Sequence, residues 1–213
     1  MALRTSLSVV ACGSLLIGTP LAVCAAASCY TIDAGGSTLG FVAEQTGATF
    51  EGSFRRFEAR ISFRPADLAA SRFDVMVEPA SVDTGEEQRD TTLRGPDFFD
   101  VARFKTAHFV TTSFRKTGDA KYEATGKLTL RDVTHDVTIA FSFTTRKEGA
   151  ADVSYLAGTA SLKRLDFGVG RGEYEDTEAV GNDVEIRFNL RLLPAARPPE
   201  KKIPAPPAPP QAK

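Results

Sequence analysis

The sequence predicts an all-β domain, and three observations lead to this prediction. Apolar and polar residues alternate along several short runs, which is the pattern of a strand with one buried face. Glycine-containing clusters such as Gly181-Asn182-Asp183 separate these runs and are typical of turns. The aromatic residues are 15 Phe and 4 Tyr, with no Trp. Because Phe has no hydrogen-bonding group, this composition suits an apolar interior.

The runs follow one another along the chain. The clearest is VEIRFNLRL, in which every second side chain of residues 184–192 is apolar. Within residues 50–63 the apolar residues stand at even positions up to Phe54 and at odd positions from Phe57 onward. This change predicts a turn or bulge near Arg55-Arg56. The residues expected on inward faces are Ile61, Phe63, Phe73, Val75, Val77, Phe109, Tyr122, Ala124, Gly126, Leu128, Leu130, Val137, Ile139, Phe141, Phe143, Val184, Ile186, Phe188, Leu190 and Leu192.

Only two segments look briefly helical. PADLAAS has Pro65 at its start, and RDTTLRG ends at Gly95. About eight antiparallel strands can form either a sandwich or a closed barrel, and periodicity does not choose between them. A barrel of about eight strands is either filled by its own side chains or holds one small ligand.

The two ends of the chain differ in composition from the middle. Residues 1–27 combine Arg4, a mostly apolar run and a small-residue triplet, which indicates a cleavable secretory signal peptide rather than a membrane anchor. Residues 194–213 are rich in Pro and Ala and predict a disordered or polyproline-like tail. After cleavage Cys29 is the single remaining cysteine, so no internal disulfide is expected.

The composition argues against several function classes. The formal charge is −1 and basic residues do not cluster, so nucleic acid is not expected as a partner. The only histidines, His108 and His135, have no convincing serine or cysteine partner, and no zinc or calcium ligand set occurs. No catalytic residue, metal or cofactor is therefore predicted.

The segment SVDTGEEQRDTTLRGPDFFD, residues 81–100, groups carboxylates, hydroxyls and two Phe residues between strand-like runs. Arg89 and Arg94 lie among its acids, and an arginine beside a carboxylate lowers the carboxylate pKa. A lowered pKa is the wrong direction for a general acid. The segment therefore looks structural, or like a polar lid.

This segment, extended to VARF, closely resembles the signature of the YceI-like family of exported polyisoprenoid-binding proteins. Further matches follow in the family's order, including GKLTLRDVTHDVTIAFSF and VGNDVEIRFNL, so that the resemblance covers residues 30–193. In the hairpin, Asp132 and His135 replace the glycine and lysine of the family pattern. We expect Asp132 to accept a left-handed turn conformation.

The resemblance implies an extended, eight-stranded, antiparallel, lipocalin-like barrel over residues 28–193, with one or two short helices. Its interior would take a long apolar chain, such as a polyprenyl or quinone tail. Ser81, Thr84 and Arg94 would form a polar rim together with an Arg89–Asp90 ion pair. The candidate ligand-binding residues are Phe41, Phe54, Phe57, Ile61, Phe63, Val75, Val77, Arg89, Asp90, Leu93, Phe98, Phe99, Phe109, Leu128, Leu130, Phe141 and Phe167.

The expected function is therefore that of a periplasmic carrier for an isoprenoid or other long-chain lipid, without catalysis. One alternative is a stress-related envelope protein with a filled barrel that acts through its loops or Pro-rich tail. A lipid-modifying enzyme is a third class. A homodimer is left open, and a membrane b-type cytochrome is a partner that rests on the resemblance alone.

Overall fold

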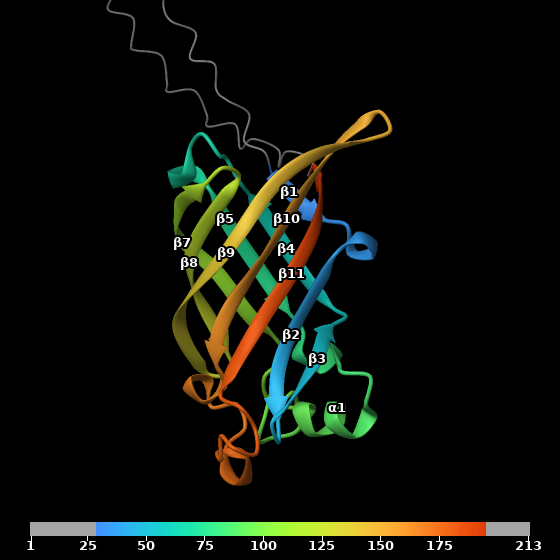
Figure 1. Ribbon diagram of the computed structural model, residues 1–213, viewed down its shortest axis with the longest axis vertical. Helices are drawn as coiled ribbons and strands as arrows, with labels where there is room; N and C mark the ends of the chain where they lie inside the picture. Colours follow the sequence, from blue (N-terminus) through green and yellow to red (C-terminus); the bar gives the residue numbers. More distant parts are fainter. Residues whose placement is uncertain (1–28, 195–213) are drawn as a thin grey trace, which may run out of the picture.

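The computed structural model describes residues 29–194, and these residues form a closed antiparallel barrel with one α-helix at its lower end (Figure 1). The predicted signal peptide (1–27) and all but the first residue of the predicted tail (194–213) lie outside the described residues. The elements are β1 (Cys29–Ile32), β2 (Thr38–Gln45), β3 (Ala48–Phe54), β4 (Phe57–Ser62), β5 (Arg72–Val77), β6 (Val82–Asp83), α1 (Glu87–Arg94), β7 (Ala107–Gly118), β8 (Lys121–Leu130), β9 (Val133–Glu148), β10 (Ala151–Lys163) and β11 (Asp183–Pro194).

The barrel closes through β11, which pairs with two segments on the same side. Its last residues pair with β1, as in Ile32↔Leu192, and its middle pairs with β2, as in Thr38↔Asn189. Thus β1 and β2 act as one strand interrupted by a short 3₁₀ turn (Ala34–Gly36). In the same way β3 pairs with β2, and β4 pairs with β1. Counted so, the ring has eight strands, which confirms the barrel and rules out the sandwich.

The bend between β3 and β4 lies where the parity of the apolar residues changes. Arg55 and Arg56 separate the two segments, as the sequence predicts. Because of this bend, Phe54 of β3 and Phe57 of β4 both face the interior, although an odd spacing of three positions would put them on opposite faces of a regular strand. The predicted helix RDTTLRG, residues 89–95, is α1, which begins two residues earlier at Glu87 and has Gly95 as its C-cap, whereas PADLAAS forms only one 3₁₀ turn (Leu68–Ala70).

Aromatic rings fill one end of the barrel, where β1 begins and β4 ends. Phe63 is 1% exposed, and its ring centroid lies 4.9 Å from that of Tyr122 and 5.4 Å from that of Phe141. Phe73, Phe114 and other rings extend this cluster at similar spacings. Edge-to-face contacts dominate, as the charge distribution of aromatic rings favours. We call this group the aromatic plug, because it closes that end to solvent.

At the opposite end, loops are held by arginines that bind backbone carbonyls. Arg164, in a 3₁₀ turn (Arg164–Phe167) after β10, is 5% exposed. Its five N–H groups donate at 2.6–3.0 Å to the carbonyl oxygens of Val169, Gly170, Tyr174, Val180 and Gly181. Burial lowers the pKa of this guanidinium, yet a guanidinium stays charged in proteins. The loop between β10 and β11 is therefore wrapped around one buried cation.

Arg131 joins this loop to the segment after α1. Its Nη1 donates to the carbonyl of Phe98 at 2.6 Å and to that of Gly168 at 2.9 Å. The β8–β9 turn that carries it has a left-handed residue, but that residue is Arg131, with φ 58°, and not Asp132. The expectation for Asp132 was wrong because the two-residue turn places its left-handed conformation one position earlier.

Among residues 29–194 no helix is both long and apolar enough to cross a membrane.

We predict that Phe63→Ala destabilises the protein by about 3–5 kcal/mol, because it leaves a void inside the aromatic plug. Met76→Ala is the matched control, since Met76 is 44% exposed on the outer face of β5, and it should cost less than about 0.5 kcal/mol. Urea unfolding measures both free energies. Equal losses of unfolding free energy in the two variants would show that the aromatic plug contributes no more to stability than an exposed side chain does.

We also predict that Arg164→Lys destabilises the barrel by at least about 2 kcal/mol, because a lysine ammonium has three donors and leaves buried carbonyls without a partner. Arg187→Lys on β11 is the control, because Arg187 is half exposed and forms surface ion pairs with Glu51 and Glu185. It should leave the unfolding midpoint unchanged. An Arg164→Lys protein as stable as the wild type would contradict the assigned role of the five bonds.

Candidate functional site

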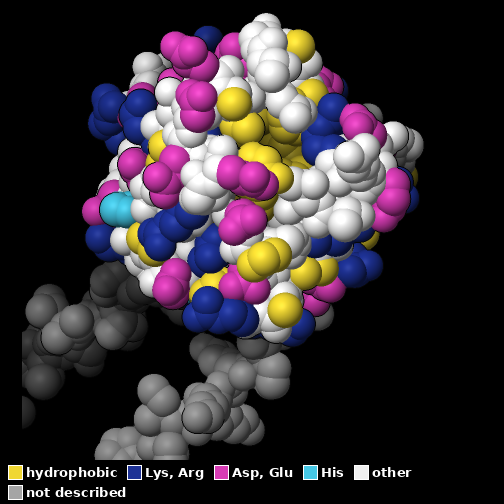
Figure 2. Space-filling model, turned by 90° about the horizontal axis from the view of Figure 1, so that it is seen from below, with side chains coloured by type: hydrophobic (Ala, Val, Ile, Leu, Met, Phe, Trp, Pro, Cys, Tyr) yellow, Lys and Arg dark blue, Asp and Glu magenta, His cyan; other side chains and the backbone are white. Residues whose placement is uncertain are grey.

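The interior of the barrel holds an apolar cavity of about 230 Å³. Inward side chains of β2 to β5 and β7 to β11, together with residues next to α1, form its wall, and nearly all of them are aliphatic or aromatic. Among residues 29–194, the one charged side chain in the wall is Arg164, whose N–H groups are all engaged by carbonyls. Seen from below, the surface is hollowed, and hydrophobic side chains of the interior are visible through the opening (Figure 2).

Two glycines leave room for aromatic rings of the cavity wall. A Cβ on Gly52 of β3 would lie 2.3 Å from the Phe41 ring, and a Cβ on Gly126 of β8 would lie 2.7 Å from the Phe109 ring. Such separations are far below van der Waals contact. The absence of a side chain at these two positions therefore allows Phe41 and Phe109 to lie against the backbone of the neighbouring strand.

The structure brings most of the predicted ligand-binding residues together in the cavity wall. Thirteen of them line it: Phe41, Phe54, Phe57, Ile61, Val75, Val77, Leu93, Phe98, Phe99, Phe109, Leu128, Leu130 and Phe167. Phe63 and Phe141 do not line it, because they lie in the aromatic plug. Arg89 and Asp90 do not line it either, because they belong to the polar side of α1. That the thirteen residues bind a ligand stays a prediction.

Sequence reasoning missed part of the wall. Leu156, Ala160 and Leu162 of β10 line the cavity, but Gly158 and the alanines around it weaken the apolar alternation of that strand. Phe50 and Phe188 also line the cavity. The alternation had placed Phe188 on an inward face, but neither residue was among the predicted ligand-binding residues, and the same period-two signal could have identified Phe50.

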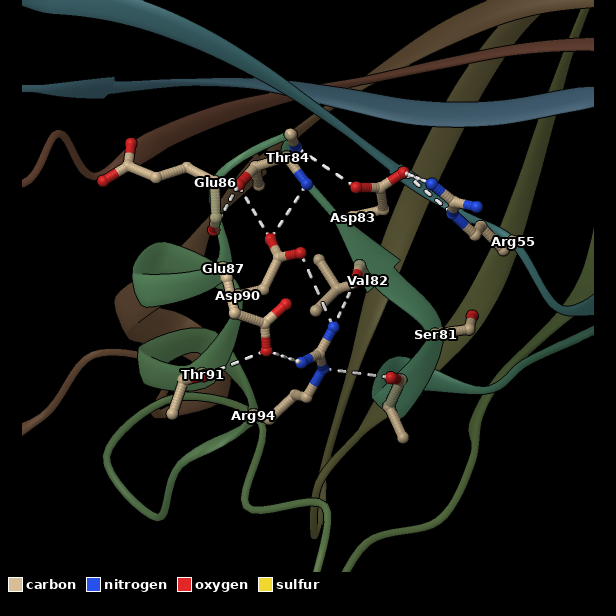
Figure 3. Close-up of polar contacts among 12 residues, drawn as sticks. Arg55, Ser81, Val82, Asp83, Thr84, Glu86, Glu87, Asp90, Thr91 and Arg94 are labelled. Atoms are coloured by element: carbon tan, nitrogen blue, oxygen red, sulfur yellow. Dashed lines mark hydrogen bonds and ion pairs between the residues drawn. The ribbon is translucent and has the colours of Figure 1, made fainter.

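The polar residues of the 81–100 segment hold α1 against β6. The Thr84 hydroxyl and backbone N–H donate to Asp90 Oδ1 at 2.7 and 2.9 Å, and Asp90 is 4% exposed. Arg94 donates to the Val82 carbonyl at 2.9 Å and lies 3.5 Å from Asp90 Oδ2 (Figure 3). Ser81 accepts a bond from the Arg56 backbone N–H at 3.0 Å. The buried polar groups of this network thus have their hydrogen-bond partners within it.

The predicted Arg89–Asp90 ion pair is wrong. Arg89 pairs with Glu86 at 2.6 Å, and Asp90 pairs with Arg94. Consecutive residues on a helix point in different directions, whereas residues three and four apart share a face. The helix therefore sets the partners at spacings of three and four.

The 81–100 segment also supplies apolar wall to the cavity. Leu93, Phe98 and Phe99 face inward, with the Phe99 ring 5.9 Å from that of Phe54.

Hydrogen bonds from Arg55 and from the Gly85 N–H lower the pKa of the Asp83 carboxyl. That direction fits a structural acid and not a general acid.

The two histidines lie away from the cavity. His108 Nε2 is 2.8 Å from Asp74 Oδ1 on the outer face, and this bond lowers the pKa of Asp74. His135 is exposed and its Nε2 lies 3.1 Å from the Asp166 carbonyl. Within residues 29–194 no three His, Cys, Asp or Glu side chains are placed to hold a metal ion.

Comparisons with known proteins agree with this architecture. The model of the YceI-like domain matches residues 30–192. A UPF0312 protein of Vibrio vulnificus (strain YJ016) is 34% identical over 181 residues, covering 80% of this chain and 94% of the relative. A UPF0312 protein of Ectopseudomonas mendocina is 35% identical, covering 78% of this chain and 88% of the relative.

Solved structures share the barrel. The crystal structure of Burkholderia cenocepacia BcnA has a TM-score of 0.69 and 32% identity, covering 75% of this chain and 98% of that one. A polyisoprenoid binding domain from Saccharophagus degradans has a TM-score of 0.61, covering 80% of this chain and 100% of that one. At 16% identity, the second likeness shows the fold alone. Because the family match spans nearly the whole barrel and the relatives are covered almost end to end, this chain belongs to the YceI-like family.

Proposed function

We propose that the protein binds and carries a long apolar chain of the isoprenoid type inside its barrel, without chemical change to that chain. The observation that carries this proposal is the cavity inside the barrel, open at its lower end, with an almost entirely carbon-lined wall. A filled barrel, which the alternative of an interaction protein requires, has no such space. The polyisoprenoid-binding neighbour of the same fold supports the assignment by analogy.

The size of the cavity sets how much of a chain it holds. One water-sized group needs roughly 10–15 Å³ of such space, so 230 Å³ accommodates about 15–20 carbon atoms, or three to four isoprene units. Each buried methylene contributes about 0.8 kcal/mol, so about 15 of them contribute roughly 12 kcal/mol. This gain is of the same size as the roughly 4–15 kcal/mol cost of association. A longer chain would extend through the lower opening.

The absence of catalysis is part of the same proposal. The charged side chain of the wall, Arg164, has every N–H engaged, and the acidic network of α1 satisfies itself. We further propose that residues 1–27 direct the protein to the periplasm, where a soluble carrier shields an apolar chain from water. The homodimer and the b-type cytochrome stay predictions.

Lipid extraction tests the proposal directly. The protein, purified from its exporting host without detergent, should yield an apolar long-chain compound in organic solvent at a near-stoichiometric amount, detected by mass spectrometry. Protein that is repeatedly empty, and that binds no prenyl hydrocarbon after delipidation, would overturn the function.

A pair of substitutions on β10 separates binding in the cavity from binding elsewhere. Ala160 lines the cavity and is 7% exposed, whereas its neighbour Thr159 points outward. Ala160→Phe should occupy ligand space and weaken binding of the hydrocarbon β-farnesene by about tenfold or more, the equivalent of roughly two lost methylene contacts. Thr159→Phe should change it less than about twofold. Displacement of the fluorescent apolar probe N-phenyl-1-naphthylamine measures both, and equal affinities would place the ligand outside the barrel.

A further inference from the structure

The aromatic rings of the interior fall into two groups. One group lines the cavity, and the other forms the aromatic plug. In the part of the chain that the structure describes, Phe73 is the one ring that belongs to both groups. It lines the cavity, and its centroid lies 4.9 Å from that of Phe114, 5.3 Å from that of Phe141 and 5.9 Å from that of Phe63. Phe73 therefore marks the inner end of the cavity.

Two aliphatic side chains complete this inner end. Ile61 of β4 lies opposite Phe73 in the register of β4 and β5, and Leu156 of β10 lies opposite Phe143, a ring that packs against Phe63 of the plug. All three side chains line the cavity, and each is at most 2% exposed. An interior packed this closely takes up additional carbon atoms only if side chains are displaced. We call Ile61, Phe73 and Leu156 the cavity floor.

The backbone of the floor at Phe73 is fixed by a hydroxyl group on β7. Thr111 Oγ1 accepts a hydrogen bond from the Phe73 N–H at 2.8 Å and donates one to the Phe73 carbonyl at 3.4 Å, and Thr111 is 6% exposed. The pairing of β7 with β8 shifts register between Thr111 and Ser113. This bulge re-aims the strand, so that Phe114, three positions after Thr111, also reaches the interior and packs against the Phe73 ring. Phe73 is thus held at its backbone and at its ring.

The distance from the floor to the opening limits how much of a chain leaves water. Carbon atoms inside the cavity contribute to binding, whereas carbon atoms beyond the lower opening stay in contact with water. The gain in affinity per added isoprene unit should therefore end once a chain reaches from the floor to the opening. For a cavity of about 230 Å³, this length is roughly four units.

We propose that Phe73 determines the length of chain that the protein recognises. The chain enters through the lower opening, its apolar end stops at the Phe73 ring, and isoprene units beyond roughly the fourth do not contribute to binding. This inference rests on the proposed function, since it presupposes a chain in the cavity. It makes the aromatic plug a boundary of the binding space and not a part of that space.

Prenyl alcohols of increasing length test the inference, because they share one hydroxyl and differ only in the number of isoprene units. For delipidated wild-type protein, the affinity should rise at least about tenfold per unit from geraniol through farnesol to geranylgeraniol. It should rise less than about twofold from geranylgeraniol to geranylfarnesol, which has one unit more. Phe73→Ala removes about six carbon atoms from the floor, the equivalent of roughly one unit, so in this variant the added unit should again give at least about tenfold. Displacement of N-phenyl-1-naphthylamine measures all affinities.

Two further variants complete the test. Phe114→Ala is the matched control, because it removes the same atoms from a ring that contacts Phe73 but does not line the cavity. It should keep the wild-type length limit. Phe73→Leu disturbs the core less than Phe73→Ala and still enlarges the cavity, so the unit added in geranylfarnesol should raise its affinity at least about threefold. Circular dichroism checks that each variant keeps the β fold.

Three results would overturn the inference. In the first, the wild-type affinity keeps rising about tenfold per unit beyond geranylgeraniol. In the second, the folded Phe73 variants keep the wild-type limit, and in the third, Phe114→Ala moves the limit as far as Phe73→Ala does. In all three cases the alcohols still bind, so the proposed function stands without this inference. If no prenyl alcohol binds to the wild type, both fail.

Discussion

The closure of the sheet through β11 is the constraint on which the rest of the molecule depends. Because β11 pairs with β10 on one side and with β1 and β2 on the other, the ring has no free edge, and every inward side chain faces a common interior. That interior can be reached only from its two ends. The composition of the ends therefore decides whether the barrel is a solid core or a container.

The two ends are built from different interactions. At one end, large rings such as Phe63 and Phe141 pack edge to face and close the interior. At the other end, Arg131 and Arg164 hold loops by their carbonyl oxygens, and the wall there is supplied by Leu93, Phe98 and Phe99. Hydrophobic packing thus seals one end, while polar bonding shapes an opening at the other. The polar network of α1 belongs to this second end, where it fixes the helix while its Asp90 and Arg94 stay outside the cavity wall.

Alternation along the chain was enough to predict the strands, the bend at Arg55-Arg56 and the inward faces, because burial of one face of a strand imposes a period of two. It could not predict depth along the barrel axis. Phe63 and Phe141 face inward as predicted but lie in the plug, and only the register between strands determines that position. The sequence of β10 shows little apolar–polar alternation, because small residues such as Gly158 and Ala160 occupy its inner face. The ion-pair partners of Arg89 and Asp90 are set by the spacing of three and four residues on helix α1. Charges that are adjacent in the sequence do not reveal that spacing.

The acceptors that hold Arg164 determine how the loop between β10 and β11 responds to a change of pH. A clasp made of a guanidinium and carboxylates fails in acid, because the carboxylates take up protons. The acceptors of Arg164 are peptide carbonyls, which do not titrate, and the guanidinium keeps its charge at any pH that the fold survives. The five bonds of Arg164 therefore persist whether the carboxylates of this loop are protonated or not, and they keep the backbone of the loop in place at either extreme.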